Sequence, residues 1–193
     1  MSLVDKAIIF ATNAFEGKVR KVRNTPTILH SLEVGCIVAS MSDNLEVIAA
    51  GILHDVVEDA NVSFETLKEE FGEYVAKLVA SDTEDKRKDM PKDQSWYLRK
   101  KDTLDFIKNS KDLNEKIIIL SDKLSNIRSI SNDIDSYKGD NFFDCFNQKD
   151  PLMHYWYYDE IRKLLSDLKS YPAYQEYDSL VTKVFKRYLK EVD

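Results

Sequence analysis

The chain of 193 residues has few of the residues that bend or cross-link a protein: five glycines, four prolines and two cysteines. Cys36 and Cys145 are far apart and form no CxxC motif, which argues against a disulfide scaffold and favours a reducing compartment. No apolar run reaches the roughly 20 residues that span a bilayer, and we expect no signal peptide. We therefore expect a cytoplasmic protein with no membrane partner, and we expect Cys36, within an apolar helical pattern, to be buried.

Excess positive charge is also lacking, because the formal net charge is −6. This balance argues against broad nucleic-acid binding. The positive charges that are present fall into three clusters in the sequence. The clusters are Lys18, Arg20, Lys21 and Arg23; Lys86, Arg87 and Lys88; and Arg99, Lys100 and Lys101. A single cluster is typical of a solvated surface, whereas three of them in an acidic protein favour a local pocket for an anion.

Apolar residues recur at intervals of three and four, and no sustained alternation of period two is present. The four prolines all fall at or beside the ends of the segments with helical spacing. The length favours a single domain. We predict an all-α fold of about eight helices, near residues 4–16, 27–41, 44–59, 63–79, 94–108, 113–132, 151–169 and 173–191.

The segment Leu53–Asp59, LHDVVED, places acidic residues and a histidine among apolar ones. If residues 44–59 form one helix, His54 and Glu58 are neighbours at i and i+4, as are Asp55 and Asp59. Ionised carboxylates persist in an apolar environment only when they are paired or bound to a cation. A divalent metal ion would offset the repulsion between them.

Four residues are candidate metal ligands: His30, His54, Asp55 and Asp122. Each of them lies in an apolar helical context, and Asp122 lies in IIILSDKLSNI. A mixed set of imidazoles and carboxylates suits one first-row divalent ion such as Mn²⁺, Fe²⁺ or Zn²⁺. A lone buried histidine is more often a packed core residue, and this is our interpretation of His154, which lies beside the aromatic run HYWYY.

Four motifs resemble those of the HD-domain phosphohydrolases, in the same order along the chain. They are TPTILH at Thr25–His30, LHDVVED at Leu53–Asp59, the FG of Phe71–Gly72 and SDKLSNIR at Ser121–Arg128. More narrowly, the chain resembles the hydrolase domain of RelA/SpoT proteins and the stand-alone small alarmone hydrolases. The resemblance covers residues 7–165, which we take as the core of a single HD domain spanning 1–193, with residues 173–191 as a C-terminal helix.

The resemblance implies a helical bundle that hydrolyses the 3′-pyrophosphate of guanosine-3′,5′-bis(diphosphate), ppGpp. It implies that His30, His54, Asp55 and Asp122 hold the metal ion, usually Mn²⁺, and that Glu58 and Asp59 position and deprotonate the attacking water. It also implies that Arg20, Lys21, Lys86, Arg99, Lys100 and Asn126 bind the nucleotide substrate.

The chain departs from this family at several positions. Thr27 stands where the family often has an aromatic residue that contacts the base, so we expect weaker discrimination between guanine and adenine. Residues 133–150 resemble an insertion or an altered lid.

Two other functions remain open. One is an HD phosphatase that acts on nucleoside monophosphates or on NADPH, and the other is a metal- or nucleotide-binding module without turnover. The intact pair Glu58 and Asp59 disfavours the second, because a binding module needs no residues that activate water. The sequence indicates no oligomeric state.

Overall fold

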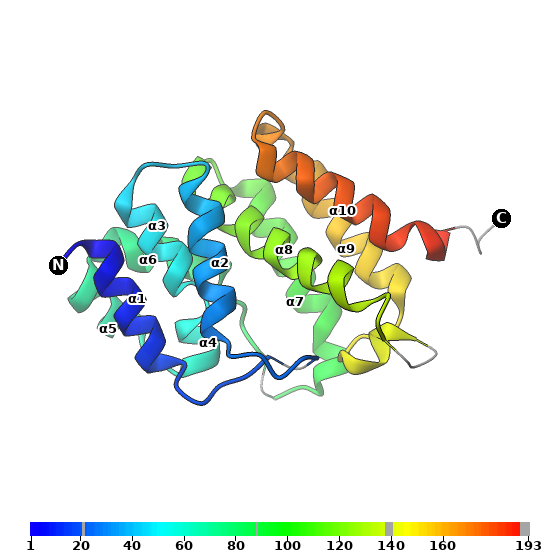
Figure 1. The fold of residues 1–193 in the computed structure, drawn as a ribbon, viewed down its shortest axis with the longest axis horizontal. Coiled ribbons are helices and arrows are strands. Elements are labelled where there is room, and N and C mark those ends of the chain that lie inside the picture. The colour runs from blue at the N-terminus through cyan, green and yellow to red at the C-terminus, as the bar shows by residue number, and fades with distance from the viewer. Residues whose placement is uncertain (21, 88, 138–140, 190–193) are drawn as a thin grey trace. The chain divides into compact units, whose positions relative to one another are not determined.

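The protein is all-α, as the sequence predicts. The computed structural model describes residues 1–193 except 21, 88, 138–140 and 190–193, and Figure 1 shows its helices. Within this described part there are ten α-helices and two short 3₁₀ helices, and the one pairing of β type is an isolated antiparallel bridge between Val19 and Pro26. No helix among the described residues is both long and apolar enough to cross a membrane.

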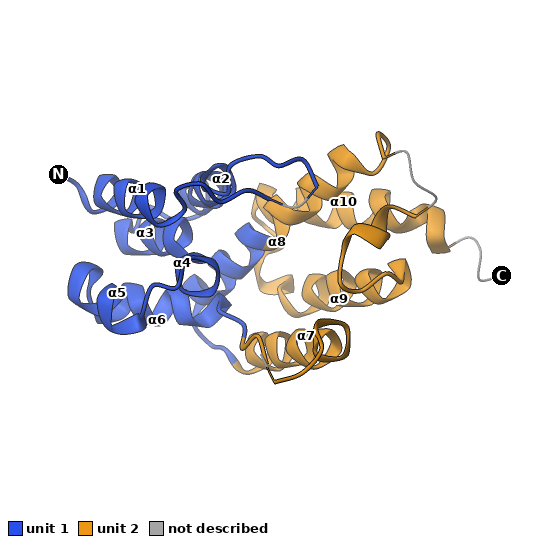
Figure 2. Cartoon of the chain, turned by 90° about the horizontal axis from the view of Figure 1, so that it is seen from below, with its two compact units in different colours: residues 1–84, 110–122 blue, residues 85–109, 123–193 orange. Residues whose placement is uncertain are grey.

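The chain divides into two compact units, which Figure 2 shows in blue and orange. Unit 1 comprises residues 1–84 and 110–122, and unit 2 comprises residues 85–109 and 123–193. The helices of unit 1 are α1 (Leu3–Ala14), α2 (Ile28–Ala39), α3 (Leu45–Leu53), α4 (Val56–Ala60), α5 (Phe64–Phe71), α6 (Glu73–Asp82) and the first half of α8 (Leu113–Asp133).

Unit 2 is built on aromatic packing. Its elements are α7 (Lys92–Asn109), the second half of α8, the 3₁₀ helix η1 (Phe142–Cys145), α9 (Pro151–Leu164), the 3₁₀ helix η2 (Ser166–Leu168) and α10 (Pro172–Leu189). Phe143, Tyr177 and Phe185 are fully buried, and the rings of Phe143 and Phe185 stack with centroids 5.8 Å apart. Phe142 and Phe143, within the segment expected to be an insertion or lid, therefore contribute to the core of this unit.

Close packing of α2 against α3 depends on two glycines. A Cβ atom on Gly35 would lie 2.5 Å from Cγ1 of Ile52, and one on Gly51 would lie 2.8 Å from Cγ2 of Val38. Contacts this short are not tolerated in a close-packed interior without a shift of the neighbouring atoms. The two glycines thus allow α2, which contains His30, to approach closely to α3, which ends beside His54.

The prediction of one helix over residues 44–59 was wrong. Helix α3 ends at Leu53 and α4 begins at Val56, with Asp55 between them at φ −94° and ψ −1°. The Nδ1 atom of His54 lies 2.8 Å from the carbonyl oxygen of Gly51. In an uninterrupted helix the N–H of Asp55 would use this oxygen, so the side chain competes with the helical hydrogen bond at this point.

The prediction of one helix over residues 63–79 was also wrong, because Gly72 separates α5 from α6. Gly72 has φ +91°, a backbone conformation that glycine adopts readily and other residues rarely do. The two breaks account for the difference between the eight predicted helices and the ten that the described residues form.

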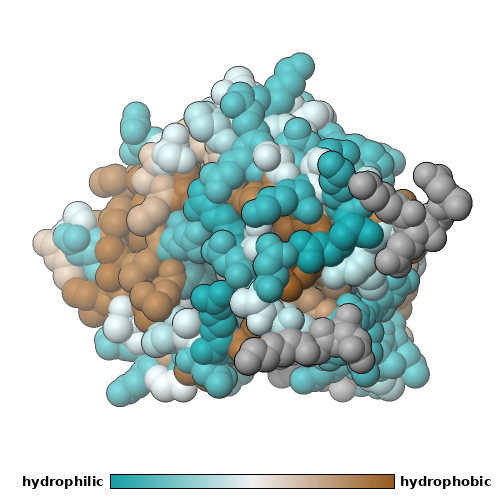
Figure 3. Space-filling view, turned by 45° about the vertical axis from the view of Figure 1, so that its right-hand side comes forward, coloured by the Kyte–Doolittle hydropathy of each residue, from teal (hydrophilic) through white to brown (hydrophobic). Residues whose placement is uncertain are grey.

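The outer side of α2 carries exposed apolar side chains. Leu29 is 56% exposed, and Cys36, expected to be buried, is exposed as well. On α1, Ile9 is 51% exposed. Hydrophobic surface is also visible in Figure 3, next to a larger hydrophilic area. The apolar pattern around Cys36 misled the prediction because both faces of α2 carry apolar residues.

Candidate metal centre

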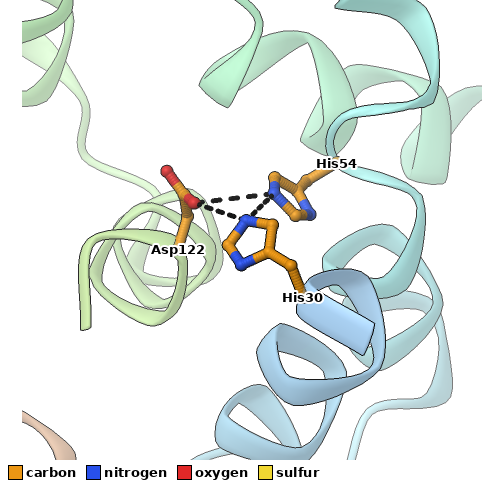
Figure 4. A group of neighbouring side chains, drawn as sticks. All are labelled: His30, His54 and Asp122. Atoms are coloured by element: carbon orange, nitrogen blue, oxygen red, sulfur yellow. Dashed lines mark hydrogen bonds and ion pairs between the residues drawn. The ribbon is translucent and has the colours of Figure 1, made fainter. Parts of the chain in front are cut away.

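Three separate elements of unit 1 bring the candidate ligands together. His30 is the third residue of α2, His54 is the residue that ends α3, and Asp122 lies on α8. Figure 4 shows the three side chains directed at one another. All three are buried, with 4%, 1% and 5% of their surface exposed, respectively. Their ligand atoms lie within 4.8 Å of one another, which is the arrangement of a candidate metal site.

The Nε2 atom of His30 lies 3.2 Å from Nε2 of His54 and 3.1 Å from Oδ1 of Asp122. The distance from Nε2 of His54 to Oδ1 of Asp122 is 3.6 Å. Asp55 joins this group, since its Oδ2 atom lies 3.1 Å from Nε2 of His54 and 3.6 Å from Nε2 of His30. The donor atoms of all four predicted ligands therefore meet around the two imidazoles.

These separations suit a shared metal ion. Ligand atoms at about 2.1 Å from one ion lie about 3.0 to 3.4 Å apart along the edges of an octahedron or a tetrahedron. The five distances given above run from 3.1 to 3.6 Å. The side chain of Asp55 is 23% exposed, whereas that of His54 is completely buried. Asp55 thus lies on the side of the cluster that water reaches.

Hydrogen bonding prepares His54 to be a ligand. Its Nδ1 atom lies 2.8 Å from the carbonyl oxygen of Gly51, so Nδ1 carries the proton and donates it to that oxygen. The lone pair of the neutral ring is then on Nε2, which faces His30 and Asp55. A backbone carbonyl that fixes the tautomer in this way is a common outer-shell partner of a metal-binding histidine.

Charges in the cluster move the pKa values of its members in different directions. Burial lowers the pKa of His30, and the nearby Asp122 carboxylate only partly offsets this. Burial also acts to lower the pKa of His54, but the carboxylates of Asp55 and Asp122 outweigh it and raise that pKa well above its usual value. Without a metal ion, the His54 ring would therefore be protonated at neutral pH, and its positive charge would balance the two carboxylates.

Asp55 is ready to bind a cation at neutral pH. Burial acts to raise its pKa, but the charge and hydrogen bond of His54 prevail and lower the pKa to about 2. The carboxylate is therefore ionised in the folded protein. A divalent ion would compete with the proton on His54 for the same negative charge, so metal affinity should decrease as pH falls.

The two acidic residues after Asp55 differ in their surroundings. Glu58 and Asp59 both lie on the short helix α4. Glu58 is half-buried, and its Oε2 atom accepts a hydrogen bond from the N–H of Glu84 at 3.3 Å. Asp59 is exposed at its side chain, and its N–H donates to the carbonyl of Asp55 at 2.8 Å. Glu58 is thus the less exposed of the two acidic residues, and its carboxylate contacts the segment that follows α6.

Arg20 is the predicted substrate-binding residue that the structure describes within unit 1. It lies in a loop closed by hydrogen bonds from Arg20 N–H to the Thr25 carbonyl at 2.8 Å and from Thr27 N–H to the Lys18 carbonyl at 3.0 Å. This loop leads into α2 two residues before His30 is reached. Lys21 lies outside the described residues.

The other predicted substrate-binding residues belong to unit 2, and their role stays a prediction. Lys86 is half-buried before α7, Arg99 and Lys100 lie on α7, and Asn126 lies on α8. The ammonium group of Lys100 lies 4.8 Å from the ring centroid of Tyr157, so it already makes a cation–π contact within this unit.

Two groups in the site were missed by reasoning from the sequence. They are the carbonyl of Gly51, which fixes the tautomer of His54, and the N–H of Glu84, which contacts Glu58. Both belong to the backbone, and every residue type except proline carries the same donor and acceptor. No side-chain pattern could therefore have identified them.

Comparison with known proteins identifies the family of this fold and cluster. A family model described as HD domain matches residues 7–140, which is more than half of the chain. The chain belongs to the HD-domain family. The histidine and aspartate that stand side by side in the sequence are His54 and Asp55, whose atoms both lie in the cluster.

Two relatives with assigned activities are about a third identical to this chain over roughly two thirds of its length. The guanosine-3′,5′-bis(diphosphate) 3′-pyrophosphohydrolase of Aquifex aeolicus is 31% identical over 127 residues, which is 66% of this chain and 18% of that protein. The bifunctional (p)ppGpp synthase/hydrolase SpoT of Escherichia coli is 32% identical over 128 residues, 65% of this chain and 18% of that protein. The chain thus matches only about a fifth of the length of these relatives.

Solved structures agree with the fold. A protein of Listeria monocytogenes, lmo0812, matches with a TM-score of 0.70 and 33% identity, covering 81% of this chain and 99% of that one. A metazoan ortholog of SpoT matches with a TM-score of 0.73 and 23% identity, covering 97% of this chain and 96% of that one. At this lower identity the second likeness is taken as showing the fold alone.

Proposed function

We propose that this HD domain is a metal-dependent hydrolase that removes the 3′-pyrophosphate of ppGpp, producing GDP and pyrophosphate. The observation that carries the proposal is the buried cluster of His30, His54 and Asp122, which the partly exposed carboxylate of Asp55 joins. The acidic pair Glu58 and Asp59 follows Asp55 closely in the sequence. The names of the two relatives from Aquifex aeolicus and Escherichia coli support this choice of substrate.

The four ligands would hold one divalent ion, for which Mn²⁺ is our first choice and Fe²⁺ or Zn²⁺ the alternatives. When bound, such an ion would supply a Lewis acid that polarises phosphate oxygens and lowers the pKa of water. Mixed nitrogen and oxygen ligands do not select strongly among these metals, so metal availability and geometry would decide. The ligand set itself is less suited to Ca²⁺, which prefers oxygen ligands alone.

Glu58 would act as the general base. A water molecule that loses its proton to the Glu58 carboxylate attacks the phosphorus atom bonded to the ribose 3′ oxygen. The bond between that phosphorus and the 3′ oxygen breaks, and the oxygen takes up a proton to become the 3′ hydroxyl of GDP. We assign the base to Glu58 rather than Asp59 because Glu58 is half-buried and Asp59 is exposed.

Arg20 would bind the substrate phosphates from the loop before α2. The guanidinium group of arginine matches the geometry of phosphate oxygens. A local positive charge is needed, because a protein with a formal net charge of −6 otherwise repels a polyanionic nucleotide. Lys86, Arg99, Lys100 and Asn126 are proposed for the same substrate on the basis of the resemblance.

The test is a screen of the metal-loaded protein against ppGpp, pppGpp, the adenine analogue of ppGpp, NADPH and nucleoside monophosphates. Products are identified by phosphorus NMR. We expect ppGpp to give GDP and pyrophosphate in equal amounts. Since Thr27 offers no aromatic ring, we also expect the adenine analogue to be cleaved. Cleavage of a nucleoside monophosphate or NADPH with ppGpp left intact would contradict the proposed substrate but not the hydrolase chemistry.

The Glu58→Gln variant separates hydrolysis from binding. This change removes the proton acceptor with little change in shape, so we expect a decrease in turnover on the order of 100-fold or more with the metal retained. Asp59→Asn is the matched variant at the exposed neighbour, and we expect it to lose much less activity. The reverse order of the two effects would transfer the role of base to Asp59.

A further inference from the structure

The end of α6 differs from the usual end of a helix. Many helices end with a residue in the left-handed conformation, and the N–H groups that follow turn back to the last carbonyls of the helix. Helix α4 ends in this way, since Asn61 has φ +58° and the N–H of Val62 donates to the carbonyl of Val56 at 3.2 Å. Helix α6 ends at Asp82 instead, and the next residue, Thr83, is extended with φ −83° and ψ 119°.

The extended conformation of Thr83 sends the next N–H away from the helix. The N–H of Thr83 itself still donates to the carbonyl of Ala80 at 3.3 Å. Its hydroxyl group donates to the carbonyl of Val79 at 2.9 Å, which satisfies one of the free acceptors at the end of the helix. The N–H of Glu84 is then directed to the carboxylate of Glu58, 26 residues earlier in the chain, at a distance of 3.3 Å.

We infer that the backbone N–H of Glu84 is a positioning group for the general base Glu58. Glu58 lies on α4, a helix of only five residues, so its own element provides little rigidity. The preceding residues on α6 are firmly placed, because Ser81 and Asp82 are buried and the hydroxyl of Ser81 donates to the carbonyl of Leu78 at 2.6 Å. A hydrogen bond from this anchored segment limits the orientations of the Glu58 carboxylate.

The inference rests on the proposed function, because a positioning group has a kinetic effect only if Glu58 takes part in turnover. A hydrogen bond to a carboxylate is stronger than one between neutral groups. Errors of about 1 Å in the position of a catalytic group can reduce the rate by about two orders of magnitude. The inference concerns the backbone donor of Glu84 and not its side chain.

The sharpest test compares a variant that lacks the donor with a variant that keeps it. Glu84→Pro abolishes the N–H, and Glu84→Ala keeps it, so the two variants both lack the side chain and differ in the donor. The preceding residue tolerates proline, because the φ and ψ of Thr83 lie close to the region that a residue before proline adopts. Metal content and melting temperature are measured alongside for both variants.

Relative to Glu84→Ala, we expect Glu84→Pro to lower kcat for ppGpp by about 10-fold or more while KM and metal content stay the same. In the Glu58→Gln background the same pair should show no such difference, since the group that the N–H positions is gone. Equal kcat in both Glu84 variants, a change in KM instead of kcat, or the same decrease in the Glu58→Gln background would overturn the inference.

A second measurement needs neither turnover nor a folded proline variant. Hydrogen exchange of the Glu84 amide is followed by NMR in the wild-type protein and in Glu58→Ala. We expect faster exchange in the variant, because its acceptor has been removed, and unchanged exchange at the Thr83 amide. Equal exchange of the Glu84 amide in both proteins would refute the contact. A wild-type protein that leaves ppGpp intact would instead refute the proposed function, and the exchange result would still decide the contact.

Discussion

Both compact units bury a histidine, and the two environments differ in kind. In unit 1, the Nε2 atom of His54 faces His30 at 3.2 Å and a carboxylate oxygen of Asp55 at 3.1 Å. In unit 2, the ring of His154 lies with its centroid 4.6 Å from that of Phe143 and 5.3 Å from that of Trp96. One histidine is surrounded by atoms that could share a cation, the other by aromatic rings.

The same contrast appears in the pKa values. Burial lowers the pKa of His154, and the carbonyl of Gln148, 2.9 Å from its Nε2 atom, does not reverse the shift. Burial acts on His54 in the same direction, yet the two carboxylates raise the pKa of His54 well above its usual value. Burial alone therefore does not identify a histidine as a metal ligand. A ligand is indicated when the ring nitrogen that is not bonded to a backbone carbonyl faces other imidazole or carboxylate groups.

The largest effect should come from removing a ligand in unit 1. We expect His54→Ala to lose nearly all bound metal and activity, because the change removes the ligand whose Nε2 atom lies closest to both His30 and Asp55 and leaves a cavity in its place. Bound metal is measured by mass spectrometry of the dialysed protein. His154→Ala is the matched control in unit 2, where metal content should match that of the wild type. Loss of metal in both variants would contradict the claim that His54 is a ligand and His154 is not.

A smaller effect should follow from filling the space between α2 and α3. Gly35→Ala places a methyl group against Ile52, so we expect a loss of stability of about 1–3 kcal/mol and weaker metal binding. Urea unfolding and metal titration measure the two effects. Ala39→Leu adds more volume at an exposed position of the same helix, and it should change stability and metal binding only slightly. If Ala39→Leu weakened metal binding as well, metal binding would not depend specifically on the packing of α2 against α3.

Charge reversal at Arg20 should act on the substrate rather than on the metal. We expect Arg20→Glu to raise KM for ppGpp by about 10-fold and to make KM less sensitive to salt, because a cation that attracts phosphates is lost. Lys186→Glu, an equal change in charge at an exposed position on α10 in unit 2, is the control. An equal rise in KM for both variants would mean that overall charge, and not the loop before α2, governs binding.

The smallest effect concerns pH and unit 2. Because the pKa of His154 is lowered in the folded protein, the unfolded chain binds its proton first as pH falls below about 6.5. The stability that neutral His154 contributes is therefore present above pH 6.5 and is lost as pH falls toward the folded-state pKa. We expect the decrease in melting temperature from pH 7.5 to pH 5.5 to be smaller in His154→Phe than in the wild type. A decrease of the same size would show that His154 does not titrate on unfolding.

The sequence was sufficient to predict the helical class and the four residues whose donor atoms the structure brings together. His54 and Asp122 stand out because ionisable residues are rare in apolar helical segments. The break between α3 and α4 could not be predicted, because it depends on a hydrogen bond from the His54 side chain to a backbone carbonyl. The contact of Glu84 with Glu58 was equally inaccessible, since a backbone N–H leaves no trace in the residue pattern.

Anomalous X-ray diffraction from crystals of the manganese-loaded protein tests the central claim most directly. We expect one strong anomalous peak in unit 1, at about 2.0 to 2.3 Å from the nearest atoms of His30, His54, Asp55 and Asp122. No peak should occur beside His154. A metal ion bound elsewhere, or none bound under saturating Mn²⁺ with the cluster intact, would contradict the assignment of unit 1 as a metal centre.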